Sequence, residues 1–216
     1  PKTLKRARLL KKIDIKSLVG IADSGTKFIH RKALRFKDPT INIRVVSFKS
    51  TSLRESGTVI TGDPLPALEV KIHNPHPVAS ITLVGKSLPK NAELTRQAIR
   101  IVHRNLLAVS EDSDSMILYV SETSSMAGQI ARLHETVVRN PSGVALATRR
   151  GLGLITVKGV GLEETPGVVA KISEVLRENN INIFGILTIT SSVVIVLDWK
   201  VRNRAGRLIR GVLEQN

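Results

Sequence analysis

Cysteine is absent from this sequence of 216 residues, and its absence excludes both disulfide bonds and thiol catalysis. Long apolar runs are absent as well, because no segment approaches the roughly 18 consecutive apolar residues of a membrane-spanning helix. No signal-peptide pattern precedes the first predicted elements. We therefore expect a soluble, cytoplasmic protein, whose length suffices for one large domain or for two to three small ones.

Acidic residues are few compared with basic ones. The chain has 18 Asp and Glu against 33 Lys and Arg, which gives a formal net charge of +15. Residues 1–65 hold 15 of the basic residues and 5 of the acidic ones, so the excess is concentrated at the front of the chain. A balance of this kind can indicate a nucleic-acid partner. One or two short helices are expected within residues 17–34. Two helices around a turn would suggest a helix-turn-helix, although any helical pair around a glycine-containing turn satisfies that pattern.

The most informative stretch covers residues 154–197. Apolar and polar residues alternate over residues 155–158, as in a half-buried strand, before two glycines interrupt the pattern. Thr165 is suited to cap a helix, and Pro166 is suited to its first position. Apolar side chains at helical spacing then predict a helix, and two further apolar segments predict strands after it.

The loop that enters this helix is the candidate ligand site. Unpaired N–H groups at a helix N-terminus, together with the helix dipole, can hold a carboxylate or a small anion. Most capped helix starts bind nothing, but Gly167 lets the backbone come close to a ligand. The predicted ligand-binding residues are Glu164, Thr165, Pro166, Gly167, Val168 and Val169, with Asn182 and Ile183 from the following strand and with Thr190 and Ser191 as secondary candidates.

The same stretch carries a resemblance to a known family. The order Gly-x-Gly-Leu-x-x-Thr-Pro-Gly-Val-Val-Ala-Lys-Ile over residues 159–172, Asn-Ile-Asn-Ile over 180–183 and Ser-Ser-Val-Val-Ile-Val over 191–196 resembles an ACT domain of the aspartokinase type. The resemblance implies a βαββαβ module that binds a free amino acid as a regulatory signal, usually at an interface between two modules. Lysine and threonine are the usual effectors in that family.

An earlier segment resembles the end of the aspartokinase catalytic domain. The similarity rests on Ala22-x-x-Gly25-x-Lys27-x-x-His30, on Ile41-x-Ile43-x-Val45 and on Ser56-Gly57-Thr58-x-Ile60. Arg31 replaces the proline that usually follows this histidine in the family. We interpret His30 as a packing or capping residue, because no partners for base catalysis are nearby in the sequence.

An internal repeat of about 75 residues indicates two copies of one module. Residues 81–85 align with 155–159, residues 115–120 with 192–197, and residues 127–130 with 205–208. The first copy has Pro89-Lys90-Asn91-Ala92 in place of the Thr-Pro-Gly-Val entrance, which predicts a lost or altered ligand site. Its acidic turn at residues 110–114 is expected to be a solvated hairpin tip rather than a cation site.

We therefore predict an α+β fold with two ferredoxin-like βαββαβ ACT modules, each with an antiparallel sheet. Residues 1–64 would form the basic segment that resembles the end of the kinase domain, residues 65–141 the first module and residues 142–216 the second. The modules are expected to exchange strands, including residues 57–61 and 144–147, and to pair two chains as a homodimer.

The resemblance implies an amino-acid-binding regulatory protein or subunit that senses lysine or threonine and controls an aspartokinase catalytic domain or subunit. We predict no catalytic residues, no metal and no cofactor. The phosphate-binding segments of the kinase have no match, and the glycine pairs at 151–153 and 159–161 are too short for a dinucleotide fingerprint. The alternatives are an amino-acid-responsive nucleic-acid-binding regulator that uses the basic front segment, and a purely structural dimerisation unit.

Overall fold

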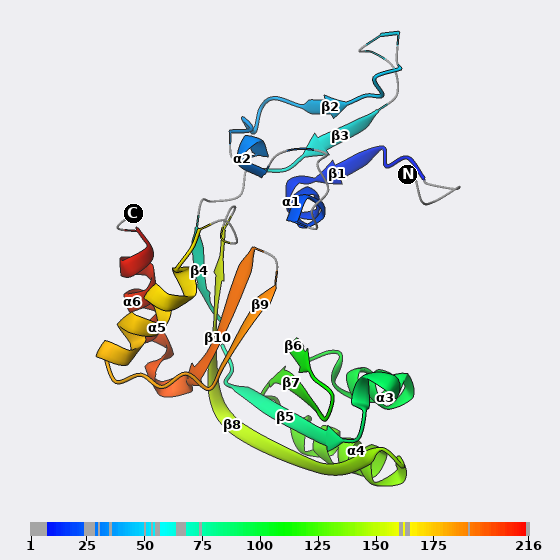
Figure 1. Ribbon diagram of the computed structural model, residues 1–216, viewed down its shortest axis with the longest axis vertical. Helices are drawn as coiled ribbons and strands as arrows, with labels where there is room; N and C mark the ends of the chain where they lie inside the picture. The colour runs from blue at the N-terminus through cyan, green and yellow to red at the C-terminus, as the bar shows by residue number, and fades with distance from the viewer. Residues whose placement is uncertain are drawn as a thin grey trace. The chain divides into compact units, whose positions relative to one another are not determined.

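A computed structural model describes most of the chain (Figure 1). The described residues are 8–23, 29, 31–34, 36–49, 51, 52, 54, 57–63, 68–73, 75–159, 162, 165–189 and 191–214. They divide into two compact units. The first unit contains Pro1–Glu69, Val157–Val168 and Thr188–Val193, and the second contains Val70–Thr156, Val169–Leu187 and Val194–Asn216.

The first unit contains a small three-stranded sheet. Its strands are β1 (Lys12–Asp14), β2 (Ile43–Val45) and β3 (Thr58–Thr61), and β3 lies between a parallel β1 and an antiparallel β2. The two helices are α1 (Ile15–Asp23) and α2 (Arg31–Leu34). A small core forms from the helices and the central strand, and it consists of Ile15, Leu18, Val19, Leu34 and Ile60.

The helices of this unit fit the predicted pair within residues 17–34, but the start differs. Asp14 is the last residue of β1 and caps the N-terminus of α1. Its carboxylate accepts hydrogen bonds from Ser17 N at 3.0 Å and from Ser17 Oγ at 2.6 Å. These hydrogen bonds also lower the pKa of the Asp14 carboxyl group. The strand β1 was not predicted. His30, Gly25 and Lys27, which carry part of the family resemblance, lie outside the described residues.

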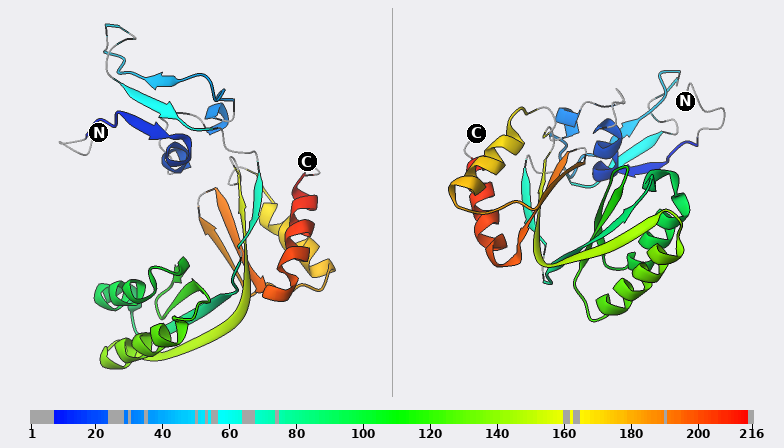
Figure 2. Two further views of the ribbon diagram at one scale, coloured as in Figure 1. Left: turned by 180° about the vertical axis from the view of Figure 1, so that it is seen from behind. Right: turned by 60° about the horizontal axis from the view of Figure 1, so that its bottom comes forward.

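Two modules of the same plan make up most of the second unit (Figure 1). The first consists of β5 (Val78–Gly85), the 3₁₀ turn η1 (Leu88–Lys90), α3 (Ala92–Val102), β6 (Leu106–Glu111), β7 (Ser115–Ser121) and α4 (Met126–Arg139). The second uses α5 (Val168–Glu178), β9 (Gly185–Ile189), β10 (Ser192–Asp198), the 3₁₀ turn η3 (Trp199–Val201) and α6 (Arg202–Glu214). The views in Figure 1 and Figure 2 agree that α3 lies beside α4, and α5 beside α6.

A single long strand, β8 (Gly143–Lys158), serves both modules. The sheet order is β6-β7-β5-β8-β10-β9, and β4 (Glu69–Ile72) pairs with β8 outside this path. The first part of β8 pairs antiparallel with β5, from Gly143 opposite Gly85 to Leu152 opposite Val78. Farther along β8, the carbonyl of Leu154 accepts a hydrogen bond from His73 N at 2.8 Å, just after β4. The start of β8 is thus the edge strand of the first module, next to β5. In the second module the corresponding edge strand is β4, next to the second part of β8.

These pairings resolve the two expected strand exchanges differently. Residues 144–147 do complete the sheet of the first module, since they pair with β5. The expectation for residues 57–61 was wrong, because Thr58–Thr61 pairs with β1 and β2 in the first unit. The strand that completes the second module is β4, which precedes the whole first module in the sequence. The module boundaries at residues 65 and 142 stay a prediction.

The first module's sheet is apolar on both faces, and each face has its own core. One face packs against α3 and α4 through Ala79, Ile81, Leu83, Leu88, Leu94, Ala98, Val102, Met116, Leu118, Val120, Met126, Leu133 and Val137. The other face joins the two modules through Val78, Tyr119, Leu152, Leu154, Val194 and Val196. Burial on both faces explains why β7 and β10 read as nearly continuous apolar runs rather than as alternating strands.

His73, just after β4, should make stability depend on pH. Its Nε2 atom is buried and has no hydrogen-bond partner within the described residues. Burial, followed by the nearby charges of Lys71 and His76, lowers the pKa of the imidazole below 6.5. The unfolded chain therefore binds more protons than the folded chain below that pH, so the free energy of unfolding should fall as pH is lowered through this window. Urea unfolding at about pH 7.5 and about pH 5.5 would measure this change.

The matched variants are His73→Gln and His76→Gln. The first should flatten the pH dependence, because it removes the imidazole whose Nε2 atom is buried. The second replaces an exposed histidine and should leave most of the dependence in place. An unchanged pH dependence in His73→Gln would contradict this assignment.

Candidate functional site

The candidate loop leads into α5, a helix held firmly by its buried face. Ile172 and Leu176 are completely buried on that face. On the exposed face, Glu174 and Arg177 form an ion pair at 2.6 Å. Asn180 adopts a left-handed φ of 55°, and Ile181 N donates to Leu176 O at 2.9 Å, which closes the C-terminal end of the helix. The entrance of α5 is therefore attached to a rigid element.

The loop itself is tied to the β9–β10 connection within the first unit. Gly159 N donates to the carbonyl of Ser191 at 3.1 Å, and Leu162 N donates to Gly159 O at 3.3 Å. Leu162 and Ser191 are both buried, with 9% and 4% of their surface exposed. The structure thus brings Ser191, one of the secondary candidates, next to the start of the loop.

The entrance to α5 is open. Thr165, Pro166 and Gly167 are exposed, whereas Val168 is buried and anchors the start of the helix. Gly167 has a φ of +81°, and no described heavy atom lies within 4 Å of the position that a Cβ would take. Val169 is 37% exposed. Backbone groups at this entrance are therefore accessible to a small ligand.

The predicted cap of this helix was displaced by two residues. The sequence favoured Thr165 as the cap and Pro166 as the first helical residue, but α5 begins at Val168. The physical reason is Gly167, whose left-handed backbone cannot belong to a right-handed helix. Pro166 and Gly167 instead form a turn before the helix.

Two further predicted ligand-binding residues, Asn182 and Ile183, follow α5 in the sequence. Asn182 is exposed and Ile183 is half-buried in the segment between α5 and β9, which belongs to the second unit. Their role in ligand binding stays a prediction. Glu164 and Thr190 lie outside the described residues.

The corresponding entrance in the first module is closed by its own side chains. Asn91 accepts a hydrogen bond from Leu94 N at 3.1 Å and thereby caps α3. The amide nitrogen of Asn91 donates to Asn140 Oδ1 at 2.8 Å, and the same oxygen accepts from Ser142 N at 2.9 Å. The side chains of Asn91 and Asn140 at this entrance are thus already hydrogen-bonded within the protein. A lost or altered ligand site in the first copy stays a prediction.

The acidic turn of the first module is a hairpin tip between β6 and β7, as expected. Asp112 Oδ1 accepts hydrogen bonds from Asp114 N, Ser115 N and Ser115 Oγ at 2.8 to 3.0 Å. These hydrogen bonds lower the pKa of the Asp112 carboxyl group. Over the described residues, no group of three or more His, Cys, Asp or Glu side chains is placed to hold a metal ion. No helix within the described ranges is both long and apolar enough to cross a membrane.

Comparisons with known proteins agree with this architecture. Residues 148–204 match the family model of the ACT domain. The aspartokinase of Geobacillus stearothermophilus is 25% identical over 210 residues, which make up 93% of this chain and 49% of that protein. The chain thus spans about half the length of this curated relative.

Solved structures show the same fold. Aspartate kinase from Synechocystis matches 98% of this chain with 39% of its own, at a TM-score of 0.76 and 19% identity. The regulatory subunit of aspartate kinase from Thermus flavus matches 68% of this chain with 99% of its own, at a TM-score of 0.58 and 19% identity. E. coli aspartokinase III in complex with lysine and aspartate, in the T-state, matches 98% of this chain with 48% of its own, at a TM-score of 0.53 and 18% identity.

These findings confirm the resemblance inferred from the sequence, to the regulatory region of aspartokinase with its ACT modules. They also confirm the mixed α+β fold with antiparallel sheets.

Proposed function

We propose that this chain, which shares an ACT domain and its fold with the regulatory regions of aspartokinases, senses a free amino acid for allosteric control. The ligand favours one arrangement of paired modules and so shifts the state of a partner catalytic domain or subunit. The chain itself transfers no phosphoryl group. Two chains associate through their ACT modules as a homodimer.

The observation that carries this proposal is the difference between the two helix entrances. At α3, Asn91 and Asn140 satisfy the polar groups internally. At α5, Thr165 to Gly167 are exposed, and the space around Gly167 is open. A chain with two copies of one module has thus kept an accessible entrance in only one copy, within the part of the structure that is described.

The chemistry of the α5 entrance suits the carboxylate of an amino acid. The first N–H groups of a helix have no partner within the helix, and the positive end of its dipole favours an anion. Gly167 allows the carboxylate to approach the backbone without meeting a side chain. Lysine and threonine are the first effectors to test, and lysine is bound in the E. coli aspartokinase III structure.

Calorimetric titration of the chain with lysine, threonine, methionine and aspartate in turn would test the proposal. We expect saturable binding of one of them with about one molecule per chain, since only the α5 entrance is open. Runs at two protein concentrations would separate ligand binding from coupled association of chains. Two equal molecules per chain would contradict the closed state of the α3 entrance. No heat from any of the four, in a folded protein, would contradict the sensor function.

A further inference from the structure

A basic groove lies on the helical layer of the first module. It runs between the C-terminal end of α3 and the N-terminal end of α4 and encloses about 530 Å³. Four of the residues that line it are cationic or basic, namely Arg100, His103, Arg104 and Arg132. Ser125 and Gln129 add polar groups to the wall. No carboxylate is among its described lining residues.

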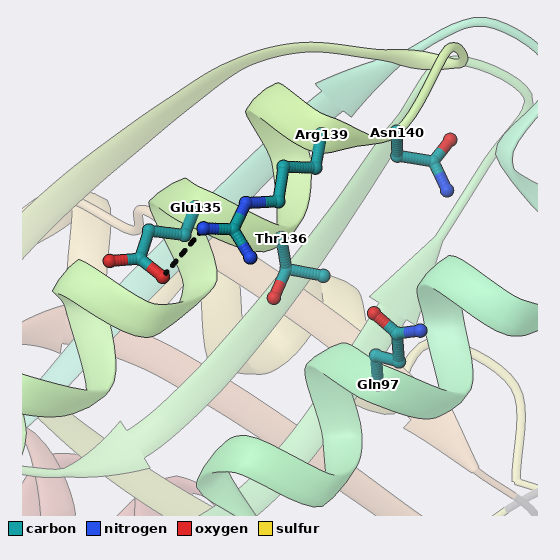
Figure 3. Close-up of a pocket in the computed structure, with 5 residues that line it drawn as sticks. All are labelled: Gln97, Glu135, Thr136, Arg139 and Asn140. Carbon is teal, nitrogen blue, oxygen red and sulfur yellow. Dashed lines mark ion pairs between the residues drawn. The ribbon is translucent and has the colours of Figure 1, made fainter.

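The arginines of this basic groove lack the ion pairs that neutralise other arginines on the same helices. All three are exposed, and none has an ion-pair partner among the described residues. Toward the other end of the helix pair, Arg96 pairs with Glu93 at 2.6 Å and Arg139 with Glu135 at 3.9 Å. Figure 3 shows the second of these pairs beside a separate cavity of about 310 Å³. Positive charge that is not compensated is therefore concentrated at one end of the helix pair.

A network of hydrogen bonds fixes the polar side chains of the groove. The amide nitrogen of Asn105 donates to Thr123 Oγ1 at 3.1 Å, Ser125 Oγ at 3.4 Å and Gln129 Oε1 at 3.4 Å. Ser125 Oγ also bonds to Thr123 Oγ1 at 2.9 Å and caps no backbone amide of α4. Next to it, Gly128 leaves open space where a side chain would stand. The positive end of the α4 dipole adds to the field of the arginines.

We propose that the basic groove binds a small, multiply charged phosphate oxyanion, such as pyrophosphate or tripolyphosphate. The planar guanidinium group donates paired hydrogen bonds that match phosphate oxygens, and three such groups line this groove. The volume is that of a small-molecule site. No Phe, Tyr or Trp is among the described lining residues, and the large aromatic platforms on which successive nucleic-acid bases usually stack are therefore not part of this lining. This site is independent of the proposed amino-acid site at α5.

Calorimetric titration with tripolyphosphate, and with citrate in parallel, tests this proposal on the full chain. We expect saturable binding of tripolyphosphate that weakens with added salt, and at least tenfold weaker binding of citrate. The double variant Arg100→Gln, Arg132→Gln should lose roughly a hundredfold in tripolyphosphate affinity, about tenfold for each charge-assisted contact. The control is Arg96→Gln, Arg139→Gln, which removes the same charge from the same two helices outside the groove and should change the affinity less than about twofold.

Several results would overturn the proposal. Equal losses in the two double variants would mean that the affinity reflects net charge rather than the groove. Undiminished binding in Arg100→Gln, Arg132→Gln, or no binding of tripolyphosphate to the unaltered chain, would remove the site. Equal binding of citrate would remove the assignment to phosphate. Binding of a DNA oligonucleotide that depends on Arg100 and Arg132, without binding of tripolyphosphate, would assign the groove to nucleic acid instead.

Discussion

Replacement of Gly167 with alanine is expected to weaken amino-acid binding by roughly tenfold or more while the chain stays folded. Gly167 has a φ of +81°, a conformation that disfavours any L-residue with a side chain by about 1–2 kcal/mol. Relaxation of this strain would turn the N–H groups at the start of α5 away from a bound carboxylate. The new methyl group would also occupy the space through which the ligand approaches. Calorimetry would measure the affinity, and urea unfolding would measure the stability.

Gly151→Ala is the matched control for this prediction. Gly151 lies within β8, has a φ of +70°, and likewise has no described heavy atom within 4 Å of its Cβ position. Its replacement should therefore cost about the same stability, roughly 1–2 kcal/mol, with no effect on affinity. A similar loss of affinity in both variants would point to general strain. Full affinity in Gly167→Ala would move the ligand site away from the α5 entrance.

The elements that could be predicted from the sequence are those whose signals are local. The helix α5 was predicted because apolar residues recur at helical spacing over a continuous segment, and its buried positions, Val168, Ile172 and Leu176, follow from that spacing. The two-module plan was predicted because the repeat appears in three separate segments. In each case the residues that form the pattern are also the residues that form the predicted element.

Pairings between distant segments could not be predicted in the same way. A strand with the sequence Glu-Val-Lys-Ile can pair with any free sheet edge, so nothing within Glu69–Ile72 indicates that its partner is β8. The length of β8 was hidden as well, because Arg149, Arg150 and two glycines interrupt the apolar pattern in the middle of the strand. Sheet pairing is decided by the whole fold, and local propensity is only weakly informative.

The same distinction between local and distant signals applies to the two candidate sites. The helix entrance could be located from Thr165, Pro166 and Gly167, since turn and cap residues act within a few positions of one another. The basic groove was missed because its arginines come from α3, from the turn after α3 and from α4, and each segment taken alone resembles an ordinary solvated surface. The available signal was the cluster of Arg100, His103 and Arg104 at and just after the end of α3, with no acidic residue three or four positions from either arginine.

Replacement of Val70 with aspartate is expected to destabilise the second module rather than the first, although Val70 precedes the first module in the sequence. Val70 is 8% exposed, its carbonyl accepts a hydrogen bond from Arg210 on α6 at 3.1 Å, and α6 packs so closely on β4 that Gly206 faces Ile72. A carboxylate at this position would lose its hydration among the apolar contacts between β4 and α6, which should lower the free energy of unfolding by about 3 kcal/mol. Urea unfolding would measure the loss.

Hydrogen exchange would then locate the destabilised region, with Lys71→Asp as the control. Lys71 is the next residue of the same strand and is exposed, so its replacement introduces the same carboxylate on the opposite face and should cost less than about 1 kcal/mol. In Val70→Asp, amides in α6 and in the second half of β8 should exchange faster, because β4 pairs with β8 and contacts α6. Faster exchange confined to β5 and β7 would instead assign β4 to the first module, as its place in the sequence suggests. The two outcomes concern different strands of one sheet. A single pair of variants therefore distinguishes a β4 that completes the second module from a β4 that belongs to the first module, which follows it in the sequence.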